Sequence, residues 1–160
     1  MKLAPRGWLL AVAALSIAAV LAALFTQYQW DMQPCPWCIL QRVQFVLVAL
    51  LALAAAFLPG RRLFAGLGVL AAASGIAAAL WQHFVAAKSS SCKLTLADKI
   101  VSGLGLDRVL PSVFEVRASC ADAAVNLLGL PYEFWSLALF VVAIALTIPA
   151  LRAQPALSTR

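Results

Sequence analysis

The sequence predicts an all-α membrane protein, a four-helix transmembrane bundle with two loops on one side, of which the second is long. Two observations predict this fold. Hydrophobic residues make up 64% of the 160-residue chain and charged residues only 11%, a composition too apolar for a soluble domain with a solvated surface. Four stretches also approach the roughly 20 apolar residues that a helix needs to cross a bilayer. We therefore expect residues 1–160 to form a single membrane domain.

The first predicted span covers about residues 8–27. Lys2 and Arg6 precede it, an arrangement that is also typical of a secretory signal peptide. The apolar run of a signal peptide is roughly 7 to 15 residues long, whereas this run extends for about 18 residues. We therefore predict a retained helix, and cleavage would leave the topology of the other three spans unchanged.

The second and third predicted spans, about residues 39–58 and 63–87, are joined by the short segment Pro59-Gly60-Arg61-Arg62. A Pro-Gly pair marks a turn, so these spans should form an antiparallel hairpin. The fourth span covers about residues 134–151. An even number of spans places both termini on one side of the membrane and the loops 28–38 and 88–133 on the other.

Apolar residues are spread among the charges of the long loop. They are Leu94, Leu96, Ile100, Val101, Leu104, Leu106, Val109, Leu110, Val113 and Phe114. Their spacing predicts a short amphipathic helix lying on the bilayer surface, and a small folded cap on the bundle is an equally open interpretation. Both interpretations keep the cysteines of this loop near the membrane.

The basic residues at the chain ends and in the turn after the second span predict the orientation. They are Lys2, Arg6, Arg61, Arg62, Arg152 and Arg160, with no acidic residue among them. The other 6 of the 12 basic residues balance the 6 acidic ones, so the formal net charge of +6 falls on this side. By the positive-inside rule this side is cytoplasmic, which places all four cysteines on the opposite, exported side, where disulfides persist. No basic patch is interleaved with aromatic residues, so we expect no nucleic-acid partner.

Tryptophans mark the predicted outer interface of the membrane. Four of the five, Trp30, Trp37, Trp81 and Trp135, fall near it. An ordinary aromatic belt explains this placement, and the alternative that some of these rings line an aromatic pocket stays open.

The residues Cys35-Pro36-Trp37-Cys38 lie where the first loop enters the second span. A thiolate near a helix N-terminus and a cationic side chain is stabilised, which favours a reactive pair. The loop that this pair closes is too short for it to serve as a staple. We therefore predict that Cys35 and Cys38 are redox-active.

The other two cysteines, Cys92 and Cys120, lie in the long loop. As a structural disulfide they would stabilise the fold by about 3 to 4 kcal/mol, and as an electron carrier they would exchange with protein thiols. The residues alone leave both interpretations and the resting disulfide pairing open. A structural zinc site usually brings two close cysteine pairs, and haem attachment requires a histidine where Ile39 follows Cys38, so we expect neither.

Two polar residues of the predicted spans lie at a depth similar to that of the cysteine pair. Arg42 follows Cys38 by one helical turn, and a charge there is costly unless it is paired, reaches the headgroups or serves a function. His83 lies late in the third span, where an ordinary packing role is the alternative. A membrane-soluble electron acceptor with a carbonyl group would meet both side chains, which makes them candidate cofactor-binding residues.

Taken together, these residues resemble the disulfide bond formation protein B (DsbB) family of bacterial inner-membrane quinone reductases. The resemblance covers essentially the whole chain. It includes Pro34-Cys35-Pro36-Trp37-Cys38 followed by Arg42, His83 late in the third span, Cys92 and Cys120 in the long loop, Leu110-Pro111-Ser112-Val113-Phe114 before Cys120, and Leu128-Gly129-Leu130 before Trp135.

The resemblance implies a protein-disulfide oxidoreductase that sustains disulfide bond formation in exported proteins. A reduced periplasmic oxidase of the DsbA type, with a thioredoxin fold, would attack the Cys92/Cys120 disulfide at Cys92. Cys120 would then attack Cys35 and release the Cys38 thiolate. The four cysteines are thus the implied catalytic residues.

The resemblance also implies an electron acceptor, the ubiquinone or menaquinone of the lipid bilayer. Cys38 would pass electrons to the quinone, and Arg42 would hold a quinone oxygen. His83 would contribute a hydrogen bond or a proton.

Two other functions stay open. Quinone reductases of the vitamin K epoxide reductase type also place Cys-x-x-Cys at a helix end, but their loop cysteines precede the active pair in sequence, whereas here they follow it. The second is a disulfide-stapled membrane scaffold or assembly factor without catalysis. That function leaves Arg42 and the closely spaced cysteine pair unexplained.

Overall fold

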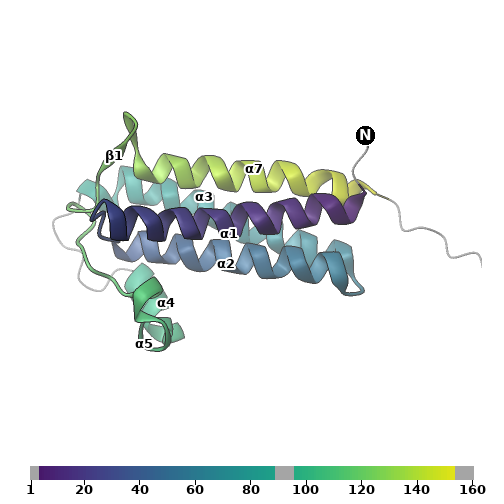
Figure 1. The fold of residues 1–160 in the computed structure, drawn as a ribbon, viewed down its shortest axis with the longest axis horizontal. Helices are drawn as coiled ribbons and strands as arrows, with labels where there is room; N and C mark the ends of the chain where they lie inside the picture. Colours follow the sequence, from purple (N-terminus) through teal and green to yellow (C-terminus); the bar gives the residue numbers. More distant parts are fainter. Residues whose placement is uncertain (1–3, 89–95, 154–160) are drawn as a thin grey trace, which may run out of the picture.

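The computed structural model describes residues 4–88 and 96–153. Its long helices lie side by side along the longest axis of the molecule (Figure 1). They are α1 (Pro5–Gln29), α2 (Pro36–Phe57), α3 (Arg61–Phe84) and α7 (Tyr132–Arg152). Each is long and apolar enough to cross a membrane. The predicted fold class, a four-helix membrane bundle, is confirmed.

The helix ends differ from the predicted spans by a few residues. The largest consequence is at α2, which begins at Pro36 and so includes Cys38, a residue that we assigned to the loop 28–38. Proline is favoured in the first helical turn because its missing N–H has no helical partner there, and Cys35 caps this turn. The third helix ends at Phe84 instead of near residue 87, and a short 3-10 helix, η1 (Ala86–Lys88), follows it.

The middle of the bundle packs through small residues and one aromatic pair. Phe45 of α2 and Phe140 of α7 stack with ring centroids 3.9 Å apart and planes 5° from parallel. Alanines of all four long helices surround this pair, which lets the backbones approach closely. Gly75 of α3 lies directly against the fully buried Phe140 ring.

We expect Gly75→Ala to destabilise the bundle by about 1 to 3 kcal/mol, a typical cost of overpacking. A Cβ atom at this position would lie 2.4 Å from two Phe140 ring carbons. The ring has no room to retreat because it stacks on Phe45. Thermal unfolding in detergent, followed by loss of helical circular dichroism, measures the change.

Gly66→Ala on the same helix is the matched control for this substitution. A Cβ atom at Gly66 meets nothing within 4 Å, so its unfolding midpoint should stay the same or rise slightly. Equal midpoints for the two variants would contradict the packing described for Phe140.

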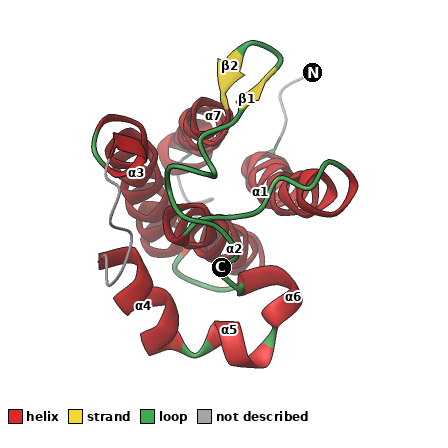
Figure 2. Ribbon diagram, turned by 90° about the vertical axis from the view of Figure 1, so that its left-hand side faces the viewer, coloured by secondary structure: helices red, strands yellow, loops and turns green. Residues whose placement is uncertain are grey.

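The long loop folds over one end of the bundle. Three short helices, α4 (Leu96–Leu104), α5 (Leu106–Val109) and α6 (Pro111–Phe114), curve around the end of α2 (Figure 2). Ala97 and Val101 of α4 are buried in the same cluster as Cys35, whereas Leu96 and Leu104 are exposed. The short amphipathic helix is therefore confirmed, and it packs against the first turns of α2 at the flank of the bundle (Figure 1). Its contact with a bilayer surface stays a prediction.

A two-stranded hairpin that the sequence analysis did not predict precedes α7. Strand β1 (Asn126–Leu127) pairs antiparallel with β2 (Leu130–Pro131). Leu128 and Gly129 between them have φ angles of 53° and 82°, and positive φ at both central residues is typical of a tight hairpin turn. The hairpin brings the chain directly into α7 at Tyr132.

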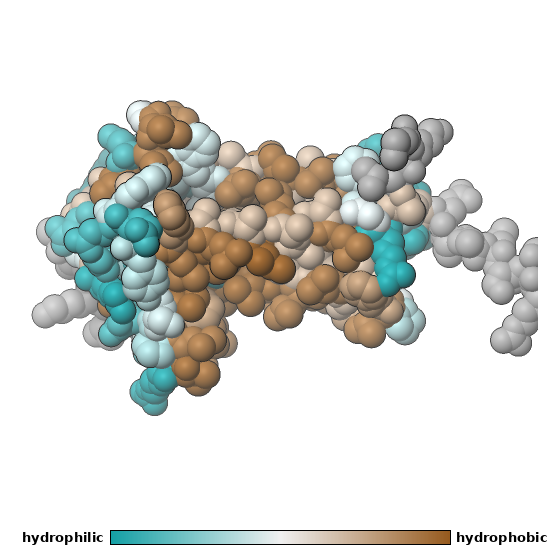
Figure 3. Space-filling model, viewed as in Figure 1, coloured by the Kyte–Doolittle hydropathy of each residue, from teal (hydrophilic) through white to brown (hydrophobic). Residues whose placement is uncertain are grey.

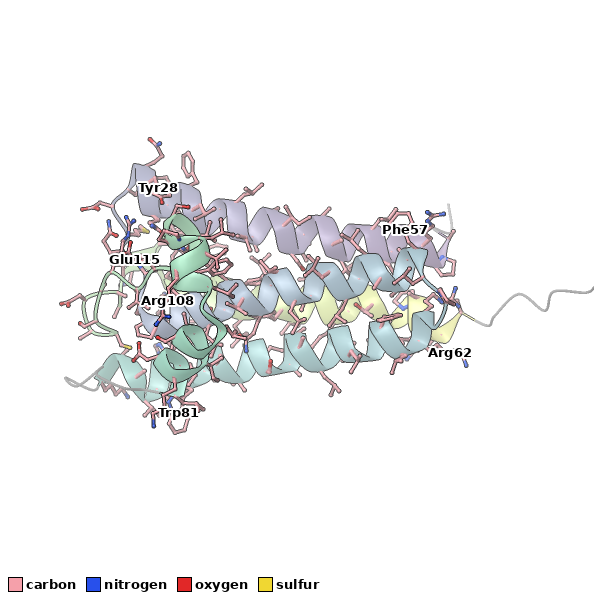
Figure 4. All side chains as sticks on the ribbon, turned by 90° about the horizontal axis from the view of Figure 1, so that it is seen from below. Tyr28, Phe57, Arg62, Trp81, Arg108 and Glu115 are labelled. Carbon is pink, nitrogen blue, oxygen red and sulfur yellow. The ribbon has the colours of Figure 1, made fainter. Side chains whose placement is uncertain are left out.

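The two ends of the bundle differ in their polar groups. An apolar band covers the middle of the molecule in Figure 3, and hydrophilic residues gather at both ends. Figure 4 shows Arg62 at one end and Tyr28, Trp81, Arg108 and Glu115 at the other. We name these the arginine end and the cysteine end, since Cys35 at the start of α2 belongs to the second.

Candidate functional site

The first cysteine pair is built into the N-terminus of α2. Cys35 is the N-cap residue, and its sulfur accepts a hydrogen bond from the backbone N–H of Cys38 at 3.3 Å. The two sulfur atoms lie 2.7 Å apart. Cys35 is fully buried, while Cys38 is partly accessible. The helix dipole favours negative charge on sulfur at this position.

Backbone contacts bring Cys120 close to Cys35. The N–H groups of Arg117 and Ala118 donate to the carbonyl of Pro34 at 3.0 and 3.2 Å. Cys120 is buried in the same cluster as Cys35. Its hydrogen bond with Cys35, together with the hydrogen bond to Cys38 and burial, raises the pKa of the Cys35 thiol well above its usual value. The fourth predicted catalytic residue, Cys92, lies outside the described residues.

Arg42 is buried among protein oxygens, with 5% of its surface exposed. It donates to the side chain of Gln27 at 2.7 Å and to the carbonyls of Val113 and Ala23 at 2.8 and 3.3 Å. These bonds join α2 to α1 and to α6. No carboxylate pairs with Arg42 within residues 4–88 and 96–153, so its positive charge is not neutralised by an acidic side chain there. The guanidinium binds protein oxygens and does not reach out to lipid headgroups, which was the alternative.

A cavity of about 760 Å³ opens between α1, α2 and α7, and both Cys38 and Arg42 line it. Most of the remaining wall is apolar or aromatic. It includes Ala19, Ala22, Ala23, Phe45, Leu139, Trp30 and Trp135. Tyr132 lines the same cavity and shares a hydrogen bond with Thr26 at 3.0 Å. Two of the four outer tryptophans therefore line a pocket, as one of our two interpretations proposed.

Two glutamines that the sequence analysis missed complete the surroundings of Cys38. Gln82 of α3 donates from Nε2 to the Cys38 sulfur at 3.3 Å, and its Oε1 accepts from Gln41 of α2 at 2.8 Å. Both side chains are buried. Their signal in the sequence is an amide side chain directly before Arg42 and another directly before His83, in otherwise apolar spans.

His83 does not line this cavity. Its Nδ1 lies 2.7 Å from Oε1 of Glu133, at the interface of α3 and α7, and its ring contacts Phe84 and Phe134. Glu133 is 4% exposed, and its Oε2 has no hydrogen-bond partner among the described residues. The prediction that His83 contacts an electron acceptor stays a prediction.

We expect His83→Leu to destabilise the bundle more than the double variant His83→Leu/Glu133→Leu. The single change leaves a buried carboxyl group without its partner, whereas the double change removes that group. A double-mutant cycle on unfolding in detergent should give a coupling of about 1 to 3 kcal/mol. Additive effects of the two changes would show that the contact contributes nothing.

The comparisons with known proteins agree over nearly the whole chain. The family model described as disulfide bond formation protein DsbB matches residues 5–150. Disulfide bond formation protein B 1 of Pseudomonas syringae pv. syringae is 36% identical over 151 residues, which cover 91% of this chain and 88% of that protein. Disulfide bond formation protein B of Cupriavidus metallidurans is 34% identical over 152 residues, which cover 93% of this chain and 94% of that protein.

Proposed function

The chain belongs to the disulfide bond formation protein DsbB family, and on that premise we propose that it reoxidises a DsbA-type thiol oxidase and passes the electrons to a membrane quinone. The family makes it a multi-pass membrane oxidoreductase that forms disulfide bonds. One observation carries the finer proposal: Cys35 is buried beside Cys120, while its partner Cys38 lines a cavity together with Arg42.

The first step is exchange between the partner protein and the long loop. A thiolate of the reduced partner attacks Cys92 in the Cys92/Cys120 disulfide, forming a mixed disulfide and releasing Cys120 as a thiolate. The second partner thiol then resolves the mixed disulfide. The partner leaves oxidised, and the loop pair has gained two electrons.

The second step is exchange between the loop and α2. The Cys120 thiolate attacks the Cys35 sulfur and forms a Cys35–Cys120 disulfide, while the Cys35–Cys38 bond breaks and Cys38 leaves as a thiolate. Cys92 then attacks Cys120, which restores the Cys92/Cys120 disulfide and releases Cys35, so that Cys35 and Cys38 now hold the two electrons. The two backbone hydrogen bonds to the Pro34 carbonyl support this step because they hold the 117–120 segment beside Cys35. The leaving sulfur lies in the first turn of α2, where the helix N-terminus stabilises negative charge.

The cavity fits a quinone. Its volume of about 760 Å³ lies within the usual range for small-molecule sites. Its walls combine apolar side chains with polar ones, among which Gln41 and Gln82 lie beside Cys38. Arg42 would hold a quinone oxygen, and Cys38 lines the same cavity. A bound ubiquinone or menaquinone supplies an acceptor for the two electrons and two protons released when two thiols become a disulfide.

Arg42 also acts on the protein's own sulfur. Its guanidinium is one helical turn from Cys38 and has no carboxylate partner among the residues that the structure describes. In a buried site of low dielectric, an unneutralised cation favours the thiolate over the thiol. Arg42 therefore stabilises the Cys38 thiolate when the disulfide opens.

We further propose that the protein lies in the bacterial inner membrane with both termini in the cytoplasm. The excess of basic residues at the arginine end supports this orientation. The cysteine end would then face the periplasm, where the partner oxidase and its exported substrates lie and where disulfides persist.

The test mixes the purified, oxidised protein with a reduced DsbA-type partner and ubiquinone-1. Loss of partner thiols and loss of quinone absorbance should proceed together, at a ratio of about one quinone per disulfide formed. Omission of the partner is the control and should leave the quinone oxidised. If thiols and quinone both stay unchanged, the alternative of a disulfide-stapled scaffold without catalysis is favoured.

A further inference from the structure

Cys38 has a neighbour on α3 that the exchange steps above do not use. Gln82 of α3 donates to its sulfur at 3.3 Å. The contacts of Arg42, in contrast, lie on α1 and α6. Gln82 is 3% exposed, and it lines the same cavity as Cys38. An amide N–H is a neutral donor, and it interacts more strongly with a thiolate than with a thiol.

The orientation of this amide is fixed by a second buried glutamine. Gln41, 4% exposed, donates from Nε2 to Oε1 of Gln82 at 2.8 Å. If the Gln82 amide were rotated by half a turn, two NH₂ groups would face each other and an oxygen would face the sulfur. With Gln41 in this orientation, an N–H of Gln82 is directed at Cys38.

Two buried amides between α2 and α3 are costly in a membrane bundle, where apolar side chains would fill the same space at no cost in desolvation. The cost is explained if the pair stabilises a charge that forms during the reaction. We propose that Gln82 is a further catalytic residue, whose N–H stabilises the thiolate released when the Cys35–Cys38 bond opens, and that Gln41 is a positioning residue for Gln82. This inference rests on the proposed function and adds the group that donates a hydrogen bond to the leaving Cys38 thiolate.

Other ionisable groups also face the two sulfurs, and all proteins compared in a test must carry the same set of them. Cys35 and Arg42 lie on or next to α2, Tyr132 faces Cys38 from α7, and Cys120 contacts Cys35 from the long loop. None of them lies on α3. A substitution at Gln82 therefore changes the donor to Cys38 and leaves these charges in place.

The experiment measures alkylation of Cys38 by iodoacetamide in the full-length protein carrying Cys35→Ala, which keeps Cys38 reduced. Peptide mass spectrometry separates the Cys38 product from those of the other cysteines. At pH 7 we expect Gln82→Leu and Gln82→Met to slow alkylation about tenfold, because one lost hydrogen bond to a charged group corresponds to about one pH unit. At high pH, where the thiolate is fully formed, the rates should converge.

Two further variants sharpen the test. Gln41→Leu should slow alkylation in the same direction but less, because the Gln82 amide remains and loses only its fixed orientation. Gln44→Leu is the matched control, since Gln44 lies on the same helix and donates to Ser74 at 3.1 Å instead of to a cysteine. Its alkylation rate should equal that of the parent at every pH.

The outcomes separate this inference from the proposed function. Unchanged alkylation rates at pH 7 would overturn the role of Gln82. Rates lowered by the same factor at all pH values would also overturn it, since that pattern shows that iodoacetamide reaches Cys38 less easily and not that the thiol ionises less. Quinone reduction by the parent protein does not enter this measurement. If alkylation behaves as expected but the parent reduces no ubiquinone-1, the proposed function fails and the stabilised Cys38 thiolate remains.

Discussion

Cys38→Ser should abolish quinone reduction, lowering the turnover number by about a thousandfold or more, a typical consequence of removing a reacting nucleophile. Serine has nearly the same size as cysteine, so Cys35 should still cap α2 and the cavity should keep its shape. The hydroxyl cannot form a disulfide with Cys35. The measurement is the steady loss of quinone absorbance in the presence of excess reduced partner.

The same variant should still react once with the partner. Exchange at the long loop needs only Cys92 and Cys120, so each protein molecule should oxidise no more than one partner molecule before it stalls. This single turnover, followed by thiol titration, also shows that the variant is folded. Quinone consumption at the parental rate would mean that electrons leave the protein by a route that does not include Cys38.

Arg42→Gln should raise the apparent Michaelis constant for quinone by about 10- to 100-fold, which is the loss expected for a hydrogen bond from a charged group in a buried site. Glutamine retains a donor, but it removes the positive charge of a residue that lines the cavity together with Cys38. Exchange with the partner protein should continue because the backbone bonds to Pro34 hold the loop segment in place. Steady-state rates over a range of ubiquinone-1 concentrations give both constants.

A structural explanation for the Arg42 effect can be separated from a binding one. Arg42 also donates to Val113 and Gln27, so its loss loosens contacts of the loop and of α1. Arg61→Gln is the matched control, since Arg61 donates to the carbonyl of Ala153 at the arginine end. It should lower stability without changing the Michaelis constant. A lower turnover number at an unchanged Michaelis constant in Arg42→Gln would indicate a structural role alone.

The sequence was sufficient to predict the four spans. It was also sufficient to predict that Cys35, Cys38 and Arg42 lie close together near one end of the second span. The bilayer sets the length of a spanning helix, so hydropathy identifies each span even when its ends are displaced by a few residues. The Cys35–Cys38 pair and Arg42 are close in sequence, and their relative placement follows from helix geometry alone. That is why these three residues were identified before any tertiary contact was known.

The parts that were not predicted depend on how the helices are rotated against one another. Gln82 reaches Cys38 from another helix, and His83 meets Glu133 across fifty residues of chain. No local pattern encodes either contact. Apolar spans with weak periodicity do not reveal which face turns inward, since lipid and protein interior are almost equally apolar. The hairpin before α7 was missed because its strands are only two residues each.

The complete burial of Cys35 limits which thiols can react with its sulfur. Its exposed surface is 0%, so a small dissolved thiol has no approach to this sulfur from solvent. Under the proposed function, Cys120, which is buried beside it, is the protein thiol that exchanges with this sulfur, while Cys38 is partly accessible. Under the proposed function, this burial would shield the Cys35 sulfur from small thiols, so that it exchanges with the long loop and not with dissolved reductants.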